Sequence, residues 1–305
     1  MTAYQSPMPY FMDGLRGKLL VNEPMSRHTS WRTGGAADYL YIPADKQDLI
    51  RLLKQISADI DLHWVGLGSN LLVRDGGVRG MVLKTSKGLN EIQIHDGRML
   101  YAESGVSSAR VARISARNGL SGVEFLAGVP GSFGGALTMN AGAFGGETWD
   151  WVDSIECVNR SGDICHLSAG EVNYSYRSVD LPEDCWILSG ELRLEVSNSN
   201  QDGREKIRSL LDKRSHSQPV QSANAGSVFR NPEGDFAARL IEQAGMKGAV
   251  IGDAIVSEVH ANFIINRGKA TSSDIEELIE DVKEKVLSTS GIALKPEVRI
   301  LGEQK

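Results

Sequence analysis

Three glycine-rich segments lie in the first half of the chain, and their residue types are those of anion-binding loops. Exposed backbone N–H groups in such loops form concavities that bind phosphate oxygens without any Lys or Arg. A single Gly-Gly pair is usually only a tight turn, but three clustered loops that contain Gly-Ser and Asn-Ala-Gly favour a phosphate-bearing ligand. The segments are residues 65–73 (VGLGSNLLV), 128–136 (GVPGSFGGA) and 140–146 (NAGAFGG).

The spacing of these glycines differs from the dinucleotide fingerprint of doubly wound sheets. That fingerprint needs GxGxxG between a strand and a helix, with an acidic residue after a later strand, and this chain has neither. The 33 glycines are concentrated between Gly66 and Gly146 without any repeat. Glycine used in this way indicates close approach of the backbone to another group.

The elements that must position these loops follow from the spacing of apolar residues. The last predicted helix opens at Ser273, with Glu276 as its capping-box partner, and ends before Gly291. Residues 128–146 are expected to form a structured loop, and the hydrophilic residues 197–204 a linker between domains. Strands with interspersed helices predict an α+β fold. The other predicted helices are 44–56, 107–118, 204–213 and 235–244, and the strands are 63–65, 71–73, 81–83, 92–94, 100–102, 155–158, 164–167, 186–196, 259–265 and 297–301.

Composition limits the partners of the chain. With 305 residues, 41% of them hydrophobic, the chain can form two or three domains. The net charge of -6 argues against nucleic acid or an anionic membrane as the main partner. The three cysteines lack metal-ligand spacing, so we expect no metal and a reducing compartment. No signal peptide or long apolar run is visible, which predicts a cytoplasmic protein without membrane attachment.

Six motifs in order along the chain resemble the UDP-N-acetylenolpyruvoylglucosamine reductase family. The similarity spans residues 29–302 and implies an FAD-binding domain of the vanillyl-alcohol-oxidase type. Two lobes would hold FAD, residues 1–80 with 291–305 and residues 81–199, and residues 200–290 would form a third, α+β substrate-binding domain. The motifs are GSNLLV from Gly68, GVPG from Gly128 with GGA from Gly134, NAG from Asn140, YR from Tyr176, GSVFRNP from Gly226 and KPEVR from Lys295.

The resemblance assigns the glycine loops to the pyrophosphate and isoalloxazine of FAD. The segment RTGG from Arg32 also matches a family segment near the flavin. Residues 124–143 contain no His or Cys, so we expect FAD to be held non-covalently. The predicted cofactor-binding residues are Gly66, Gly68, Ser69, Asn70, Gly128, Val129, Pro130, Gly131, Gly134, Gly135, Asn140, Ala141 and Gly142.

The reaction that the resemblance implies needs hydride, which no protein side chain donates. NADPH would reduce FAD and leave, and the enolpyruvyl ether of UDP-N-acetylglucosamine would then take the hydride to give UDP-N-acetylmuramate. Hydride on the terminal carbon leaves negative charge on the next carbon and its carboxylate, which needs stabilisation and a proton. By resemblance, Ser227 donates the proton, while Arg177 and Glu297 stabilise the charge. Desolvation would favour a protonated Glu297.

Substrate contacts are also expected from the resemblance. Asn231 falls at a position that the family uses for the substrate, and Lys213 and Arg214 are plausible partners for the diphosphate. For His260 a structural role is expected. Alone, a serine after Ala-Gly is usually a turn residue, and an Arg or Glu is usually a surface charge; only the motif context favours catalysis.

Two departures from the family pattern and two other functions stay open. Leu67 stands where relatives often have glycine, and the segment between Arg177 and Trp186 is too short for the inserted tyrosine-bearing loop of one branch, so the chain resembles the shorter branch.

The alternative functions are an FAD oxidase of an alcohol or sugar, and a non-catalytic flavin- or sugar-nucleotide-binding module. We expect a monomer that acts on a small sugar nucleotide.

Overall fold

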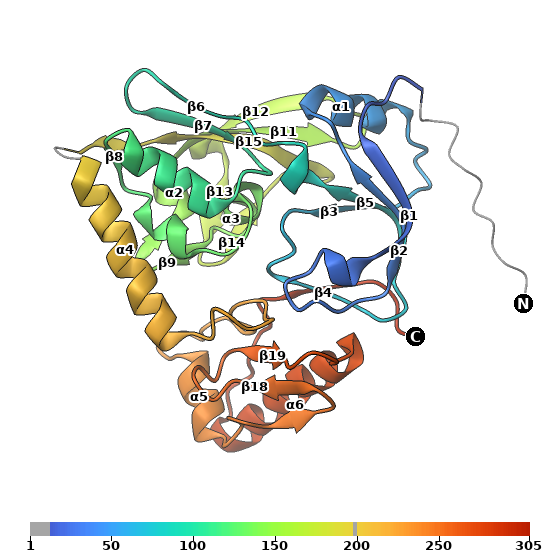
Figure 1. The fold of residues 1–305 in the computed structure, drawn as a ribbon, viewed down its shortest axis with the longest axis vertical. Coiled ribbons are helices and arrows are strands. Elements are labelled where there is room, and N and C mark those ends of the chain that lie inside the picture. Colours follow the sequence, from blue (N-terminus) through green and yellow to red (C-terminus); the bar gives the residue numbers. More distant parts are fainter. Residues whose placement is uncertain (1–12, 198–199) are drawn as a thin grey trace, which may run out of the picture.

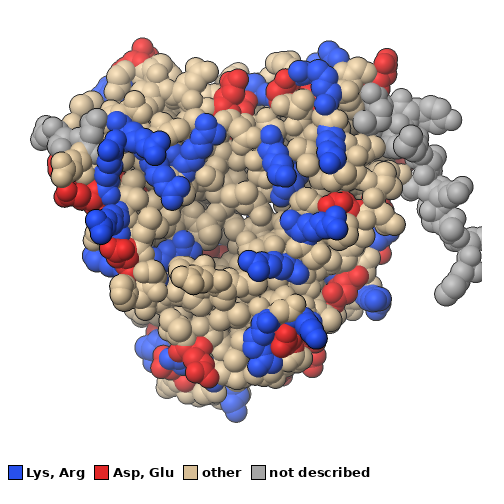
Figure 2. Space-filling view, in the orientation of Figure 1, with Lys and Arg blue, Asp and Glu red and all other residues tan. Residues whose placement is uncertain are grey.

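A computed structural model describes residues 13–197 and 200–305, which form two lobes and a third domain (Figure 1). We define the first lobe as residues 13–84 with 299–305, the second lobe as residues 85–217 and the third domain as residues 218–298. In the space-filling view a hollow opens in the middle of the molecule, with Lys and Arg side chains arranged around it (Figure 2).

The first lobe is built on a four-stranded sheet in the order β1-β2-β5-β3. β1 and β2 are antiparallel, whereas β2, β5 and β3 run parallel and α1 makes the crossover. Asp45 caps α1 by accepting the N–H of Asp48, which satisfies one of the free donors of the first turn. A separate parallel pair joins β4 to β20, so the C-terminal segment returns to this lobe. The elements are β1 (Lys18–Pro24), β2 (Ala36–Ile42), α1 (Lys46–Gln55), β3 (Leu62–Val65), β4 (Leu71–Val73), β5 (Val78–Lys84) and β20 (Arg299–Leu301), with a 3-10 turn at Met25–Arg27.

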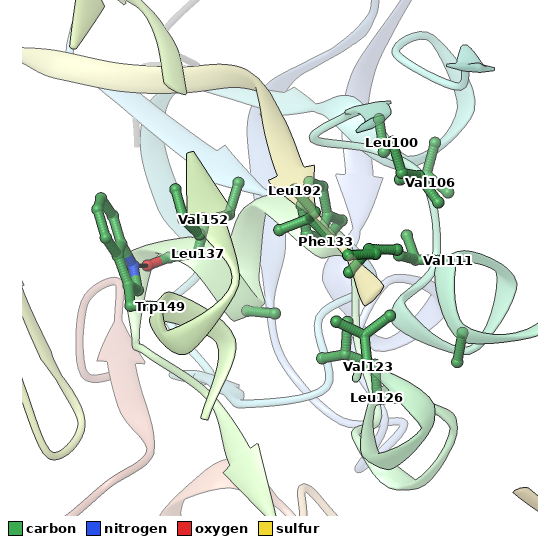
Figure 3. Packing of buried hydrophobic residues seen from close by; sticks show 14 of the residues in the cluster. Leu100, Val106, Val111, Val123, Leu126, Phe133, Leu137, Trp149, Val152 and Leu192 are labelled. Atoms are coloured by element: carbon green, nitrogen blue, oxygen red, sulfur yellow. Dashed lines mark hydrogen bonds between the residues drawn. The ribbon is translucent and has the colours of Figure 1, made fainter. Parts of the chain in front are cut away.

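The second lobe is a five-stranded antiparallel sheet in the order β12-β11-β15-β7-β6, covered by α2 and α3. Its core packs Phe133 and Leu137 of α3 against β-strand residues, and the Trp149 indole N–H donates to the Leu137 carbonyl at 2.8 Å (Figure 3). The main elements are β6 (Ile92–His95), β7 (Met99–Glu103), α2 (Ser108–Arg117), α3 (Phe133–Thr138), β11 (Val152–Asn159), β12 (Ile164–Ser168), β15 (Cys185–Arg193) and α4 (Asn200–Ser217). The minor elements are β8 (Leu120–Ser121), β9 (Gly142–Ala143), β10 (Gly146–Glu147), β13 (Asn173–Ser175), β14 (Ser178–Asp180), β16 (Glu195–Val196) and 3-10 turns at Thr85–Lys87, Glu124–Gly128, Thr148–Asp150 and Ala169–Glu171.

The third domain packs α5 and α6 on a small antiparallel sheet, β17-β18-β19. Trp31 of the first lobe is buried in this core, and its indole N–H donates to the Ile264 carbonyl at 2.8 Å. The buried face of α6 has apolar residues at helical spacing, Ile275, Leu278, Ile279, Val282 and Val286. The elements are α5 (Ala237–Gln243), β17 (Val250–Ile251), β18 (Ala254–Val256), β19 (Ile264–Asn266) and α6 (Ser272–Ser290).

Three local predictions were wrong. The capping box of α6 joins Thr271 and Asp274, because Ser273 instead donates to Asp75 at 2.8 Å and Glu276 pairs with Arg74 at 2.7 Å. Residues 197–204 are not an extended linker, since α4 already begins at Asn200. The segment 128–146 is not loop throughout, because it contains α3 and the β9–β10 hairpin.

The predicted domain limits shift for physical reasons. A boundary at residue 80 would cut β5, which is continuous with the sheet of the first lobe. A boundary at residue 200 would separate α4 from the second lobe, although Ile207 is buried in that core and Lys206 pairs with Glu124 at 3.1 Å. α4 therefore belongs with the second lobe and spans the distance to the third domain (Figure 1).

Candidate active site

One cavity of about 620 Å³ lies where the two lobes and the third domain meet. Its volume falls within the range of small-molecule and cofactor sites, about 300–1,000 Å³. All three parts of the molecule contribute to its wall. Of the predicted site residues, those that line it are Gly66, Gly68, Ser69, Asn70, Gly128, Val129, Pro130, Gly131, Gly134, Gly135, Ala141, Gly142, Arg177, Arg214, Ser227 and Glu297.

The first two glycine loops approach each other so closely that side chains would collide. A Cβ on Gly66 would lie 2.1 Å from the hydroxyl oxygen of Ser132, across the gap between the lobes. Gly68 has a positive φ of 72°, and a Cβ there would lie 1.9 Å from the His28 carbonyl oxygen. Ser69 ties the loops together by donating to the Pro130 carbonyl at 3.0 Å. We call residues 66–70 with 128–135 the glycine cradle; its bare backbone fits a phosphate-bearing cofactor.

Asn70 joins the glycine cradle to the C-terminal segment. The side-chain amide nitrogen of Asn70 donates to the main-chain carbonyl of Glu297 at 3.0 Å. The main-chain carbonyl of Asn70 accepts the N–H of Arg299, also at 3.0 Å. These bonds continue the parallel pairing of β4 with β20. The last motif in the sequence is thereby brought to the first one, across more than two hundred residues.

Glu297 and Arg177 form a largely buried ion pair. Arg177 Nε lies 3.1 Å from Glu297 Oε1, and the two side chains are 16% and 14% exposed. The other guanidinium nitrogens donate to the carbonyls of Asn140, at 3.3 Å, and Gly142, at 3.0 Å. Burial raises the pKa of Glu297, although the guanidinium groups of Arg177 and Arg230 oppose the shift. Glu297 is therefore easier to protonate than an exposed glutamate.

Ser227 stands beside Glu297 on the cavity wall. The N–H of Glu297 donates to the carbonyl of Val228 at 2.7 Å, and Phe229 forms a bridge with Pro296. Gly226 supplies the positive φ of 77° that turns the chain before the serine. Within residues 13–197 and 200–305 the Ser227 hydroxyl has no hydrogen-bond partner, so its proton can be directed at a ligand.

Arg214 is a second cation on the cavity wall, in the last turn of α4. Its Nε donates to the Gln218 side chain at 3.0 Å, and among the described residues no carboxylate pairs with it. Burial lowers the pKa of the Arg214 guanidinium. A partly buried guanidinium that faces a cavity without a carboxylate is suited to an anionic ligand.

Three residues singled out from the sequence stand apart from the cavity wall. Lys213 is exposed on α4. The side-chain oxygen of Asn231 accepts the N–H of Ala237, the first residue of α5, at 3.0 Å, and a substrate contact stays a prediction. Arg32 is exposed, although its segment supports the cradle through the Ser30 N–H, which donates to the Gly68 carbonyl at 3.0 Å.

Asn140 is a predicted cofactor contact that does not line the cavity wall. Its side chain is fully buried and donates to Glu147 at 2.8 Å and to the Ser175 carbonyl at 3.2 Å, while its oxygen accepts the N–H of Trp149. Both amide protons are therefore used within the protein, and a contact of Asn140 with the cofactor stays a prediction. Asn140 also shapes the site, because its main-chain carbonyl holds Arg177.

Several lining residues were not singled out from the sequence. Arg299 lies in the quoted KPEVR motif, two residues after Glu297, and that spacing in a short strand was the available signal. Trp64 directly precedes the first glycine segment, whereas Met139, Phe263 and Trp186 gave no local signal. All five line the cavity. Within the described ranges no group of His, Cys, Asp and Glu is arranged to hold a metal, and no helix is long and apolar enough to cross a membrane.

The fold and the cradle define the class first. A model of the "FAD binding domain" family matches residues 37–168, which covers most of both lobes. A model described as "UDP-N-acetylenolpyruvoylglucosamine reductase, C-terminal domain" matches residues 218–301, which covers the third domain. The molecule is thus an FAD-binding protein with an added C-terminal domain, and the predicted fold class is confirmed.

Whole-chain similarity then gives the family. The UDP-N-acetylenolpyruvoylglucosamine reductase of Thiobacillus denitrificans is 49% identical over 306 residues, which cover 95% of this chain and 94% of the relative. That of Methylococcus capsulatus is 50% identical over 288 residues, 94% of each chain. The crystal structure of the reductase from Thermus caldophilus superposes with a TM-score of 0.79 at 29% identity, over 94% of this chain and 99% of that one. The chain belongs to the UDP-N-acetylenolpyruvoylglucosamine reductase family.

Proposed function

We propose that this chain reduces UDP-N-acetylglucosamine enolpyruvate to UDP-N-acetylmuramate, with NADPH as reductant and FAD as bound cofactor, in the synthesis of the peptidoglycan precursor. The observation that carries the proposal is that Ser227, Arg177 and Glu297, from three distant segments, line the same cavity as the glycine cradle. Membership of the family favours this reductase over the alcohol or sugar oxidase and the non-catalytic module.

The residues of the cavity fit FAD. The cradle offers backbone N–H groups where a Cβ would collide, which is the environment that a pyrophosphate needs. When bound, FAD supplies the carrier that takes hydride from NADPH and gives it to the substrate. The glycines and Ser69 would hold the pyrophosphate, and Ala141 and Gly142 would lie beside the ring system. We expect acid precipitation of the protein to release the flavin, because the attachment is non-covalent.

The three side chains at the reaction end have complementary roles. Arg177, held by two carbonyls and by the Tyr176 ring 4.9 Å away, would keep its positive charge where the substrate carboxylate gains negative charge. Glu297 in its protonated form would donate a hydrogen bond to the same oxygens. Ser227 would then give its hydroxyl proton to the carbon that carries the negative charge, which completes the addition of hydride and proton across the double bond.

The sugar nucleotide brings a diphosphate of its own. Arg214 is the cation best placed to receive it, because it faces the cavity from α4 and no carboxylate of the described chain neutralises it. Asn231 stays a predicted contact on the third domain. The site takes all its described residues from one chain, which supports a monomer. We propose that it acts in the cytoplasm.

The proposal is tested by separating the two half-reactions in the absence of oxygen. NADPH should bleach the flavin absorbance near its visible maximum, and stoichiometric UDP-N-acetylglucosamine enolpyruvate should restore it, with the lactyl ether product found by mass spectrometry. UDP-N-acetylglucosamine, which lacks the double bond, is the control and should restore nothing. Bleaching that the enolpyruvyl substrate does not reverse would remove the substrate from the proposal.

A further inference from the structure

A buried carboxylate attaches α4 to the second lobe. Glu124 opens the 3-10 turn Glu124–Gly128, and its side chain is only 3% exposed. Its Oε2 accepts the Gly122 N–H at 3.0 Å and lies 3.1 Å from the Lys206 ammonium on α4. Among the side chains that the structure describes, Lys206 is its one cationic partner. A carboxylate so far from water is stable only beside a cation, so the fold has to keep this contact.

The direction of α4 is set by its first half. The buried residues of this helix are Gly203 and Ile207, both within about its first three turns. Gly203 is so close to α2 that a Cβ there would lie 3.0 Å from the Ala116 Cβ, while Ile207 enters the core of the second lobe and Leu211 packs against it. Beyond Leu211 the helix is exposed except at Arg214. α4 thus extends from the lobe toward the third domain like an arm (Figure 1).

Arg214 lies at the far end of this arm and faces the cavity. It follows Lys206 by eight residues, which is about 12 Å along the helix axis. A tilt of α4 by about 10° at the Lys206 contact would therefore move Arg214 by about 2 Å. The bond from Arg214 to Gln218 does not prevent this, because Gln218 directly follows the same helix. A misplacement of about 1 Å at a site can already cost up to about 10²-fold.

We propose that Glu124 and Lys206 are a positioning pair, which holds α4 at the angle at which Arg214 meets the diphosphate of the sugar nucleotide. The inference rests on the proposed function and adds to it two residues that do not line the cavity. Both act through the helix and not by contact with the ligand. The pair joins a turn of the second lobe to the cation at the third domain, so it controls substrate affinity and leaves the chemistry of hydride transfer alone.

The test measures substrate binding without turnover. Oxidised FAD has no hydride to give, so UDP-N-acetylglucosamine enolpyruvate can be titrated into the oxidised holoprotein by calorimetry. In Lys206→Met we expect its Kd to rise about three- to thirtyfold, as partial loss of a charged hydrogen bond predicts. The limiting rate of flavin reoxidation and the FAD affinity should change by less than about twofold. Lys206→Arg keeps the charge and should restore most of the substrate affinity.

A second variant covers loss of folding in Lys206→Met, which leaves a buried carboxylate unpaired. Glu124→Gln removes that charge but keeps an acceptor for the Gly122 N–H, and it should raise the Kd by a similar factor. Arg208→Met, which removes another exposed cation of α4 outside the cavity wall, is the matched control and should leave the Kd unchanged.

A double-mutant cycle separates positioning from a general structural role. Arg214→Met alone should weaken substrate binding, and adding Lys206→Met to it should change the Kd by less than about twofold, because the pair acts through that guanidinium. Additive losses would overturn the inference, and so would an equal loss of FAD affinity in Lys206→Met. An unmodified holoprotein that does not bind the enolpyruvyl sugar nucleotide would instead contradict the proposed function itself, and this inference with it.

Discussion

The glycine cradle and the reaction end share one cavity but are built in opposite ways. The cradle uses backbone from two segments, and its selectivity comes from the absence of side chains at Gly66 and Gly68. The reaction end uses side chains from positions 177, 227 and 297, and two of these residues are held by neighbouring segments. Asn70 holds the Glu297 main chain, and the Gly142 carbonyl holds Arg177. The difference teaches that affinity for the cofactor and chemistry on the substrate should respond to different substitutions.

The largest expected effect is at Ser227. Ser227→Ala removes the proposed proton donor but no part of the cradle, so bleaching by NADPH should stay nearly intact. Return of the flavin colour with the enolpyruvyl substrate should slow by about 10²- to 10⁴-fold, the usual contribution of a positioned general acid. Stopped-flow absorbance measures both half-reactions. Equal slowing of the two would remove Ser227 from the proton-donor role and blur the division between the regions.

Next in size is a substitution in the cradle. Gly68→Ala adds a Cβ that would lie 1.9 Å from the His28 carbonyl oxygen, at a φ of 72°. We expect it to lower the free energy of unfolding by about 3 kcal/mol or more, because backbone strain and a clash add, and to weaken FAD binding by at least about tenfold. Urea denaturation and flavin titration measure the two effects.

A matched control isolates the clash. Gly97 has a similar φ of 70° in the β6–β7 turn, but a Cβ there would have nothing within 4 Å. Gly97→Ala should cost only the strain, about 1 kcal/mol, and leave FAD affinity unchanged. If both variants lost the same free energy of unfolding and bound FAD with the same affinity, close packing at Gly68 would not be needed for the stability of the cradle or for FAD binding.

The sequence predicted the local features of both regions well. The glycine loops and the buried face of α6 depend on neighbours in the chain, which periodicity and turn chemistry describe. α3 was missed because Gly134 and Gly135 are poor helix formers. In the fold, the Ser132 cap and the burial of Phe133 and Leu137 outweigh that propensity.

Contacts between segments far apart in the sequence could not be predicted from residue types. Asn140 was predicted as a cofactor contact, and its buried hydrogen bonds to Glu147 and Ser175 could not be predicted because they depend on where other segments fold. Trp64 and Trp186 are far apart in the sequence, and only the meeting of the lobes stacks them. The three residues proposed for catalysis were identified from motifs, whereas the contacts that hold Arg177 and Glu297 were not predicted.

One cation lies under the otherwise uncharged cradle. Lys84, only 5% exposed, donates to the Gly66 carbonyl at 3.2 Å. Burial, with a smaller effect from Lys87, lowers the pKa of Lys84 to about 8. His28, paired with Glu23 at 3.0 Å, is the other titratable group whose pKa responds to Lys84. Unlike the charged groups of the reaction end, this buried ammonium is expected to lower the free energy of unfolding of the cradle region.

The smallest expected effect is the pH dependence that Lys84 imposes on the apoprotein. Between about pH 8 and the ordinary lysine pKa of about 10.4, the folded protein loses this proton before the unfolded chain does. The unfolded state then binds more protons, so the Lys84 contribution to the free energy of unfolding rises with pH through this window. From pH 7.5 to 10, the free energy of unfolding of the unmodified protein should rise by on the order of 1–3 kcal/mol relative to that of Lys84→Met. Urea denaturation of both proteins measures it. A constant difference across that range would mean that the buried ammonium carries no desolvation cost.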